Sequence, residues 1–529
     1  PPDARDLLRV VSPIPSFGPP ELALFRWVAD RYAAAVIDTL RLAIPPRVAA
    51  VERSLESPGD EPNQPPPVPG APVREGNPAA EPIAPAVHSP PRPLAGSSDR
   101  SSLASPDPLA ALVASDRPGA VYWRPLPGED RGARVVGLIE AALARGRGAI
   151  VVTPEVAAGS AVGDAVRKAF PDAADLASDL SDRRRFRAWA ELRQGRRMVV
   201  VGGRSSVLAP LPALGCVIVD DEANFAHKEQ RSPRFHTREV ALRRAATARA
   251  LCVLTGTVPS AEALAAMQAG QCRLLAPDRA AERAARPLVE VVDPDDEGPT
   301  AARLHPRGLA AVRAALARDE PAYVLVPRRG GADPAAPGAR SAGQVAAELG
   351  RILPGVPVWR LDREVVDPGM VPPWAGRQPG VVVGTVAGVK DHPPLTGCRT
   401  VVVVGADTAL GQAEVRSAEE AYRTWSRAAA WCGPSRAGAG RLVLQTRHGG
   451  HHAVQALVRW DPEFFWRHEL PRRVELGFPP ARRLVLIEGP EPGEASAAMA
   501  ALAAALGPKV ELLGPAEMGR GWRIIAKVE

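Results

Sequence analysis

The sequence is poor in cysteine, in lysine and in aromatic residues, and it has no long apolar run. Its five cysteines lie at least twenty residues apart, which excludes a Cys-x-x-Cys metal knuckle and gives no sign of a disulfide framework. No apolar run reaches the roughly eighteen residues that a membrane span needs, and no charged-then-apolar leader is recognisable near the start. We therefore expect a cytoplasmic protein with no membrane partner.

Because lysine is so scarce, nearly all of the 66 basic residues are arginines. Arginine binds phosphates and base edges, so an arginine-rich chain with a net charge of +7 suits a nucleic-acid partner. The same bias also arises when GC-rich coding disfavours lysine codons. Composition thus leaves nucleic-acid binding and an ordinary solvated surface equally open.

The chain of 529 residues is longer than one hydrophobic core usually organises. Residues 1–50 carry a helical pattern of apolar side chains, whereas 51–117 are so rich in Pro, Gly, Ser and Ala that we expect a disordered linker. Residues 118–285 and 286–470 each alternate short β-branched runs with helical stretches, which predicts two α/β lobes with parallel sheets. Residues 471–529 predict a small α+β domain.

Individual elements can be placed within these segments. One helix is predicted from Pro19 to Pro46, and the last segment should hold a strand, an Ala-rich helix at 495–506 and two further strands. A Pro- and acid-rich stretch at 291–297 should separate the lobes. The strands predicted for the lobes are 149–153, 198–201, 216–219 and 251–254 in the first, and 323–326, 381–383, 401–404 and 442–444 in the second.

Three acids in a row follow one of these strands. Val217, Ile218 and Val219 are followed directly by Asp220, Asp221 and Glu222. In a nucleotide-hydrolysing lobe, carboxylates at the end of a strand hold Mg²⁺ and orient an attacking water. An acidic loop after any buried strand has the same sequence pattern, so the motif alone does not decide.

Segments along most of the chain resemble one family in order and spacing. Leu180-Ser181-Asp182 through Arg185 is similar to its Leu-Ser-x-x-x-Arg segment, and Asp220 to Ala223 stands where Asp-Glu-Glu-His is expected. The other matching segments are 24–32, 42–46, 152–155, 203–210, 227–235, 255–260, 327–330, 383–392, 407, 416–419, 444–446 and 477–480. On these motifs the sequence resembles primosomal protein N′ (PriA), the superfamily 2 helicases that restart stalled replication forks.

This resemblance implies two tandem RecA-like helicase lobes in an α/β fold. Residues 1–50 would be the remnant of an N-terminal DNA-binding domain, 118–285 and 286–470 the two lobes, and 471–529 the C-terminal domain. Both ends of the sequence are expected to be truncated.

The phosphate-binding loop departs from the family pattern. The family has a Gly-rich loop ending in Gly-Lys-Thr, whose backbone N–H groups hold phosphates. Here residues 124–133 read Arg-Pro-Leu-Pro-Gly-Glu-Asp-Arg-Gly-Ala, and no Gly-Lys-Ser or Gly-Lys-Thr occurs anywhere. Proline lacks the N–H donor, and Glu129 and Asp130 would repel a triphosphate.

Further departures concern the arginine finger, the coupling histidine and zinc. Residues 427–436 stand in place of the family's Gln-x-x-Gly-Arg-x-Gly-Arg, with Arg436 as a displaced candidate, and Ala223 replaces the histidine. The paired zinc cysteines of the second lobe are missing, since the chain passes straight to 331–337. Zinc is therefore not expected. The histidines at 448, 451 and 452 could bind metal, but no carboxylate or thiol completes a set.

Four basic residues lie in segments that resemble DNA-facing loops of helicases: Arg204, Lys228, Arg234 and Lys390. The arginine run 183–187 is a weaker candidate, because charge runs are usually solvated faces. Together these features favour a nucleoid-associated replication restart protein. It would bind branched DNA at stalled forks, recruit primosome and replicative helicase-loading proteins, and lack helicase activity.

Two alternatives stay open. The retained acids would also serve an active ATP-dependent 3′ to 5′ DNA helicase with an atypical nucleotide loop, which makes ATP and Mg²⁺ the candidate cofactors. A two-lobed nucleotide-sugar transferase is the third hypothesis. It requires a Gly-rich loop after the first strand of a lobe and an acid that contacts a ribose.

Overall fold

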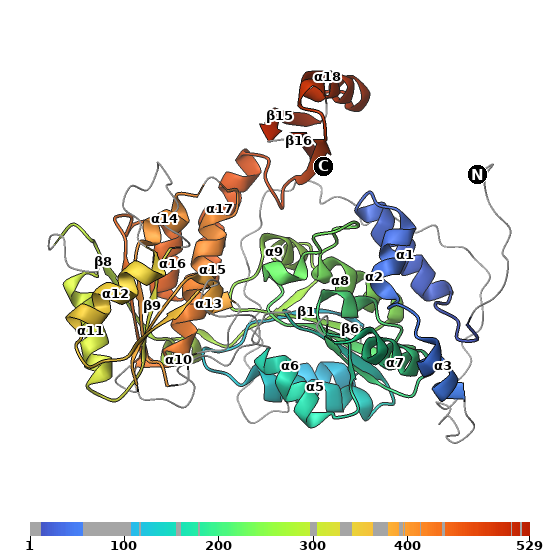
Figure 1. Ribbon diagram of the computed structural model, residues 1–529, viewed down its shortest axis with the longest axis horizontal. Helices are drawn as coiled ribbons and strands as arrows, with labels where there is room; N and C mark the ends of the chain where they lie inside the picture. Colours follow the sequence, from blue (N-terminus) through green and yellow to red (C-terminus); the bar gives the residue numbers. More distant parts are fainter. Residues whose placement is uncertain are drawn as a thin grey trace.

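The computed structural model describes most of the chain. The described ranges are 12–56, 107–115, 118–154, 160–177, 180–296, 304–327, 341–362, 379–390, 395, 397–412, 414–435, 440–508, 510–518 and 521–528. They form two parallel-sheet lobes side by side, with helices at the N-terminal end against the first lobe and a small domain at the C-terminal end (Figure 1). The fold class predicted from the sequence is confirmed. Among the helices of the described residues, none is long and apolar enough to cross a membrane.

The N-terminal segment contains more helices than predicted. It forms α1 (Pro19–Arg31), α2 (Val36–Ala43) and α3 (Ala49–Glu56). The single helix predicted from Pro19 to Pro46 is wrong, because the chain turns between α1 and α2, where Ala33 adopts a left-handed φ of 49°. The apolar face of α1 packs into the same core cluster as the first sheet. These helices are therefore part of lobe one's packing.

The predicted linker 51–117 is shorter than its composition suggests. Helix α3 extends into its beginning, and α4 (Pro108–Ala114) lies near its end, where Asp107 caps the first turn through Leu109 N at 3.0 Å. Leu109 and Val113 are buried against lobe one. Residues 57–106, the centre of the predicted linker, lie outside the described residues.

Lobe one is built on a seven-stranded sheet. Its strand order is β3-β4-β2-β5-β6-β1-β7, and every neighbouring pair is parallel. The central strands are buried on both faces, as expected for Val- and Ile-rich runs covered by crossover helices. The elements of the lobe are β1 (Gly119–Trp123), α5 (Arg131–Leu143), β2 (Gly148–Val152), α6 (Ala161–Ala169), β3 (Ala174–Asp175), α7 (Asp182–Arg193), β4 (Val199–Gly202), β5 (Leu214–Val219), α8 (Thr237–Ala248), β6 (Leu251–Thr255), α9 (Ala261–Gln268), β7 (Arg273–Leu275) and α10 (Arg279–Ala285).

Lobe two has a six-stranded parallel sheet in the order β10-β11-β9-β12-β13-β8. The stretch 291–297 was expected to separate the lobes, but its first residues complete β8, which pairs with β13 at the edge of this sheet. The elements are β8 (Leu288–Val292), α11 (Pro306–Leu316), β9 (Ala322–Leu325), α12 (Ala342–Ile352), β10 (Val358–Leu361), β11 (Val381–Gly384), α13 (Val386–Lys390), β12 (Thr400–Val403), α14 (Ala406–Leu410), α15 (Ser417–Trp431), β13 (Arg441–Gln445), α16 (His452–Arg459) and α17 (Pro462–Glu475).

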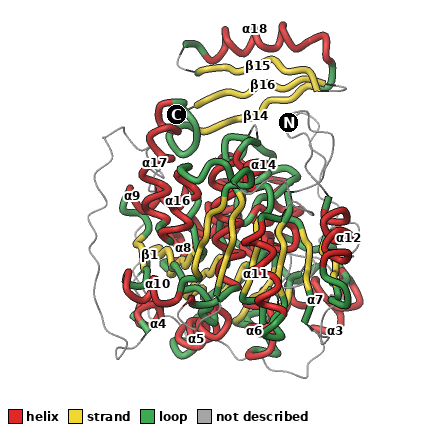
Figure 2. The backbone as a smooth tube through the Cα atoms, turned by 90° about the vertical axis from the view of Figure 1, so that its left-hand side faces the viewer, coloured by secondary structure: helices red, strands yellow, loops and turns green. Residues whose placement is uncertain are grey.

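The C-terminal domain stands apart from the lobes and is joined to them through α17 (Figure 2). It contains β14 (Arg483–Gly489), α18 (Ala495–Leu506), β15 (Glu511–Met518) and β16 (Gly521–Val528), in an antiparallel sheet of order β14-β16-β15. The predicted helix 495–506 and the three predicted strands are confirmed. Trp522 and Ile524 of β16 pack under α18 and form its small core.

Candidate functional site

The acidic motif lies at the carboxyl end of β5, a central strand of lobe one. Parallel strands bring their following loops to one edge of the sheet, and this edge faces α15 of lobe two. Asp220 and Glu222 are buried, and Asp221 has a left-handed φ of 51°. The strand thus presents three carboxylates in succession at the boundary between the lobes.

Each of the three carboxylates has an arginine partner. Asp220 Oδ1 accepts a hydrogen bond from Arg131 Nη1 at 2.8 Å, and Asp221 Oδ2 accepts one from Arg427 Nη2. Glu222 accepts from Arg238 Nη1 at 2.7 Å, and also from Ser260 N at 2.8 Å. The three bonds from guanidinium groups to carboxylates are charge-assisted.

The pKa shifts of the two aspartates reflect these neighbours. Burial raises the pKa of Asp220, and Arg131 offsets only part of that effect. Burial acts in the same direction on Asp221, but Arg427 and Arg131 outweigh it and hold the pKa of Asp221 below its ordinary value. The motif therefore keeps its negative charge on Asp221, where the arginine from lobe two meets it.

Helix α5 begins where a phosphate loop would end, and the chain's own acids cap it. Asp130 Oδ1 accepts a hydrogen bond from Ala133 N at 3.0 Å, which uses a backbone donor that would otherwise be available to an anion. Glu129 accepts from Leu126 N at 2.8 Å and pairs with Arg134 at 2.6 Å. The sequence predicted repulsion of a triphosphate by these acids, and the structure adds that both are held by local hydrogen bonds.

The residues present do not fit Mg²⁺ and a nucleoside triphosphate. Mg²⁺ requires free carboxylate oxygens in an octahedral arrangement, whereas Asp220 and Asp221 are both bound by guanidinium groups. A guanidinium beside the acids and a capped helix N-terminus replace the lysine and open backbone donors that phosphates need.

Two arginines of lobe two reach the acidic motif across the boundary between the lobes. Arg427 pairs with Asp221, and Arg423 Nη1 donates to the carbonyl oxygen of Ala223 at 2.9 Å. Both lie on α15, four residues apart and so on one face of the helix. The displaced finger candidate, Arg436, lies outside the described residues. Among the described residues of α15, Arg427 pairs with a carboxylate of the acidic motif, that of Asp221.

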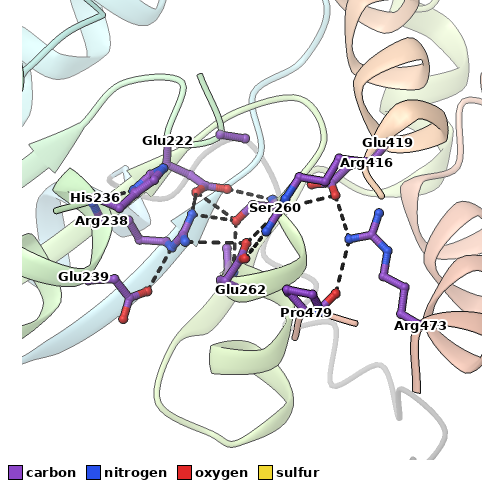
Figure 3. Close-up of polar contacts among 12 residues, drawn as sticks. Glu222, His236, Arg238, Glu239, Ser260, Glu262, Arg416, Glu419, Arg473 and Pro479 are labelled. Carbon is purple, nitrogen blue, oxygen red and sulfur yellow. Dashed lines mark hydrogen bonds and ion pairs between the residues drawn. The ribbon is translucent and has the colours of Figure 1, made fainter. Parts of the chain in front are cut away.

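A second series of ion pairs runs from the motif into lobe two (Figure 3). Arg238 contacts Glu222 and, at 3.5 Å, Glu262 of α9; Glu262 pairs with Arg416 at the start of α15. Arg416 lies 3.4 Å from Glu419. Glu262 has a lowered pKa, because Arg416 and Arg238 together outweigh the effect of its burial.

Arg131, Arg238, Glu262, Arg416 and Arg423 were not among the residues predicted from the sequence to form the site. A helical signal existed for part of this set, since Arg416, Glu419, Glu420, Arg423 and Arg427 recur at spacings of three and four residues within one helix. That pattern predicts a charged helix face but cannot name its partners. Arg131 and Arg238 had no such signal.

The four predicted DNA-binding residues differ in their surroundings. Arg204 pairs with the buried Glu229 at 2.8 Å and its side chain is 25% exposed. Lys228 lies over the ring of Tyr32 at 5.3 Å. Arg234 is 57% exposed and 3.7 Å from Glu488 of the C-terminal domain. The structure brings these three together on lobe one, whereas the side chain of Lys390 lies outside the described residues.

The arginine run on α7, the weaker candidate for DNA binding, has more exposed side chains. Arg183, Arg184 and Arg187 are exposed, and Arg187 donates to Ser54 of α3 at 3.2 Å. Arg185 is less exposed and lies 3.9 Å from Asp182. Three arginines therefore project from one face of a helix that α3 packs against.

Metal binding finds no support in the part of the chain that the structure describes. No group of three or more His, Cys, Asp or Glu side chains is arranged to hold a metal ion there. His452 is bound to Glu469 at 2.9 Å, and burial lowers the pKa of His451 to about 4. The segment 331–337, where zinc ligands were missing from the sequence, lies outside the described residues.

Two facing parallel-sheet lobes, with an acidic motif at the end of a central strand and arginines that reach it from the second lobe, define a helicase-like protein. No family model matches the chain. The protein named Probable replication restart protein PriA of Mycobacterium tuberculosis (strain ATCC 25618 / H37Rv) is 31% identical, over 97% of this chain and 82% of its own length. Replication restart protein PriA of Bacillus subtilis is 25% identical, over 77% of this chain and 58% of its own length. The chain belongs to the PriA family.

Solved structures with a similar arrangement are more distant. RecG bound to a three-way DNA junction is 13% identical with a TM-score of 0.40, and covers 68% of this chain and 47% of its own. Yeast Dbp5 bound to RNA and ADP BeF3 is 12% identical with a TM-score of 0.40, and covers 67% of this chain and 88% of its own.

Proposed function

We propose that this protein acts in replication restart by binding branched DNA and recruiting primosome and replicative helicase-loading proteins, with its two lobes serving as a scaffold and not as an ATP-driven motor. Family membership supports the restart role. The observation that carries the loss of motor activity is the set of arginine partners on Asp220, Asp221 and Glu222. The chain's own charges occupy the positions at which a helicase binds nucleotide.

We propose that exposed arginines of lobe one contact DNA. Arg234 and the α7 residues Arg183, Arg184 and Arg187 are exposed, so their guanidinium groups can reach phosphates. Arg204 is held by Glu229 and would have to exchange that partner for DNA. We therefore give the exposed arginines the larger share of binding.

One preparation can test both parts of this proposal. Fork binding should exceed duplex binding and weaken steeply with salt, because phosphate contacts release counterions. ATP hydrolysis with and without fork DNA should stay at the level of a buffer control. Equal affinity for fork and linear duplex would reject branch recognition, and failure to bind any DNA would reject the DNA-binding role.

The active helicase is the second candidate, supported by the retained acids alone. It requires Arg131 and Arg427 to withdraw from Asp220 and Asp221 when nucleotide binds. DNA-stimulated phosphate release that disappears in an Asp221→Ala/Glu222→Ala variant would establish it. The transferase hypothesis gains nothing, since the loop after β1, residues 124–130, contains two prolines and one glycine.

A further inference from the structure

Ion pairs join the two lobes at several positions along their boundary. Helix α15 supplies Arg427 to Asp221, and Arg416 at its start pairs with Glu262. The arginine after β1, Arg124, pairs with Glu463 of α17 at 2.5 Å. Separating the lobes requires all of these pairs to break.

Apolar packing continues across the same boundary. Val258, Ala261 and Leu264 belong to lobe one in sequence, yet they are buried in the core cluster of lobe two with Tyr422 and Trp425. Helix α9 thus lies in the interface and also carries Glu262. Separating the lobes would expose these apolar side chains together with charged ones.

The ion pairs form a continuous chain that reaches beyond the lobes. From Glu419, which is fully buried, Arg473 Nη1 is 2.8 Å away on α17, and Arg473 Nε donates to Glu469 at 2.9 Å. Arg473 also donates to the carbonyl oxygen of Pro479 at 3.4 Å, at the entrance to the C-terminal domain (Figure 3). One charge network therefore fixes lobe one, lobe two and the start of the C-terminal domain.

A ligand can change the arrangement of two lobes only through a difference in its affinity for the two states. In this chain Asp221 and the Ala223 carbonyl are already bonded to Arg427 and Arg423 across the boundary. Asp220 is bonded to Arg131 within lobe one. Opening the lobes would break these part-buried pairs together, so it is opposed at several positions at once.

We propose that this arginine–carboxylate network, defined as Glu222, Arg238, Glu262, Arg416, Glu419, Arg473, Asp221 and Arg427, takes the place of nucleotide as the link between the lobes. It holds the lobes in one closed arrangement without a ligand. The surface that binds DNA is therefore already formed before DNA binds. The closed arrangement is inferred from the contacts between the lobes. Only the test by DNA affinity rests on the proposed function.

Inter-lobe distance measurement tests the network directly. Exposed Lys168 of lobe one and Arg351 of lobe two can be changed to cysteine and labelled for pulsed EPR. The five native cysteines are buried and should not compete for label. We expect one narrow distance distribution in the unliganded protein, unchanged by Mg²⁺ with ATP or with ADP and beryllium fluoride.

Charge reversal supplies the matched comparison. Arg416→Glu should broaden the distribution, whereas Arg416→Lys, which keeps a positive charge between Glu262 and Glu419, should leave it narrow. Arg447→Glu is the control, because its pairs with Asp295 and Asp407 are exposed and lie within lobe two. Should Arg416→Glu fail to fold, Arg427→Gln at the other contact takes its place with the same expected broadening.

Fork affinity gives the second readout. If opening leaves about a tenth of the molecules competent, affinity should fall roughly tenfold in Arg416→Glu and stay near the wild-type value in Arg416→Lys. Two populations in the wild type that shift with ATP, or a distribution that stays narrow in the folded Arg416→Glu and Arg427→Gln variants, would overturn the inference. A closed wild type that binds no fork would reject the DNA role and leave the network standing.

Discussion

Arginine has opposite surroundings in two regions of this molecule. At and beside the boundary between the lobes, guanidinium groups are paired with carboxylates, as in Arg238 with the fully buried Glu222. On α7, Arg183, Arg184 and Arg187 point to solvent, at spacings where like charges repel. The charges of the first set are neutralised by carboxylates inside the protein. The guanidinium groups of the second set are exposed and can bind an outside partner. This difference separates residues that stabilise the protein from residues that can bind DNA.

The largest expected effect is on stability. Arg238→Ala leaves the buried carboxylate of Glu222 without its guanidinium, which should cost about 3–5 kcal/mol of unfolding free energy, measured by urea denaturation. Arg307→Ala, which removes an exposed pair with Glu290, should cost at most about 1 kcal/mol. Equal losses in the two variants would show that the buried and exposed pairs do not differ.

The reverse pattern is expected on DNA. Arg183→Ala/Arg184→Ala/Arg187→Ala should change stability by no more than about 0.5 kcal/mol. The slope of log affinity against log salt should fall by about 0.9 for each phosphate contact removed, measured by fluorescence anisotropy with a fork. Arg351→Ala on lobe two is the control. An unchanged slope would assign the α7 arginines to an ordinary solvated face.

A smaller effect is expected where α5 begins. Asp130→Ala removes the side-chain cap on Ala133 N and should cost about 1 kcal/mol of unfolding free energy. Asp130→Asn keeps an acceptor and should cost little. Neither variant should gain ATP binding in equilibrium dialysis, because Arg131 still occupies Asp220. Tight ATP binding by Asp130→Ala would contradict the assignment of a closed site.

The smallest expected effect is on how the unfolding free energy depends on pH. Asp221 and Glu262 have pKa values lowered from their ordinary 3.8 and 4.5, so their stabilisation is present above those values and is lost as the pH falls through the lowered ones. Asp220 has a raised pKa, so its contribution to the unfolding free energy has the opposite sign and is lost as the pH rises. Unfolding free energy should therefore drop below about pH 4. Asp221→Asn/Glu262→Gln should show a flatter dependence, and an equally steep one would assign the drop to other groups.

The sequence predicted most strands of the lobes because their runs of Val, Ile and Leu are long enough to fill buried strands, as in β2 and β5. It missed β1 and β10, the edge strands β3 and β7, which are only two and three residues long, and the edge strand β8, whose residues read as the start of a polar stretch. Short edge strands carry little apolar pattern of their own, so pairing with a neighbour decides them.

The candidate site divides in the same way. Residue order alone placed Asp220, Asp221 and Glu222 at a strand end and showed the loss of the phosphate loop, because both features are local. Only the tertiary structure decided what those acids bind. Arg131 and Arg427 are 89 and 206 residues away from their partners, and no local pattern encodes a contact of that separation. The sequence determined the two lobes and the absence of the phosphate-loop motif. The fold determined that arginines from both lobes pair with the acidic motif.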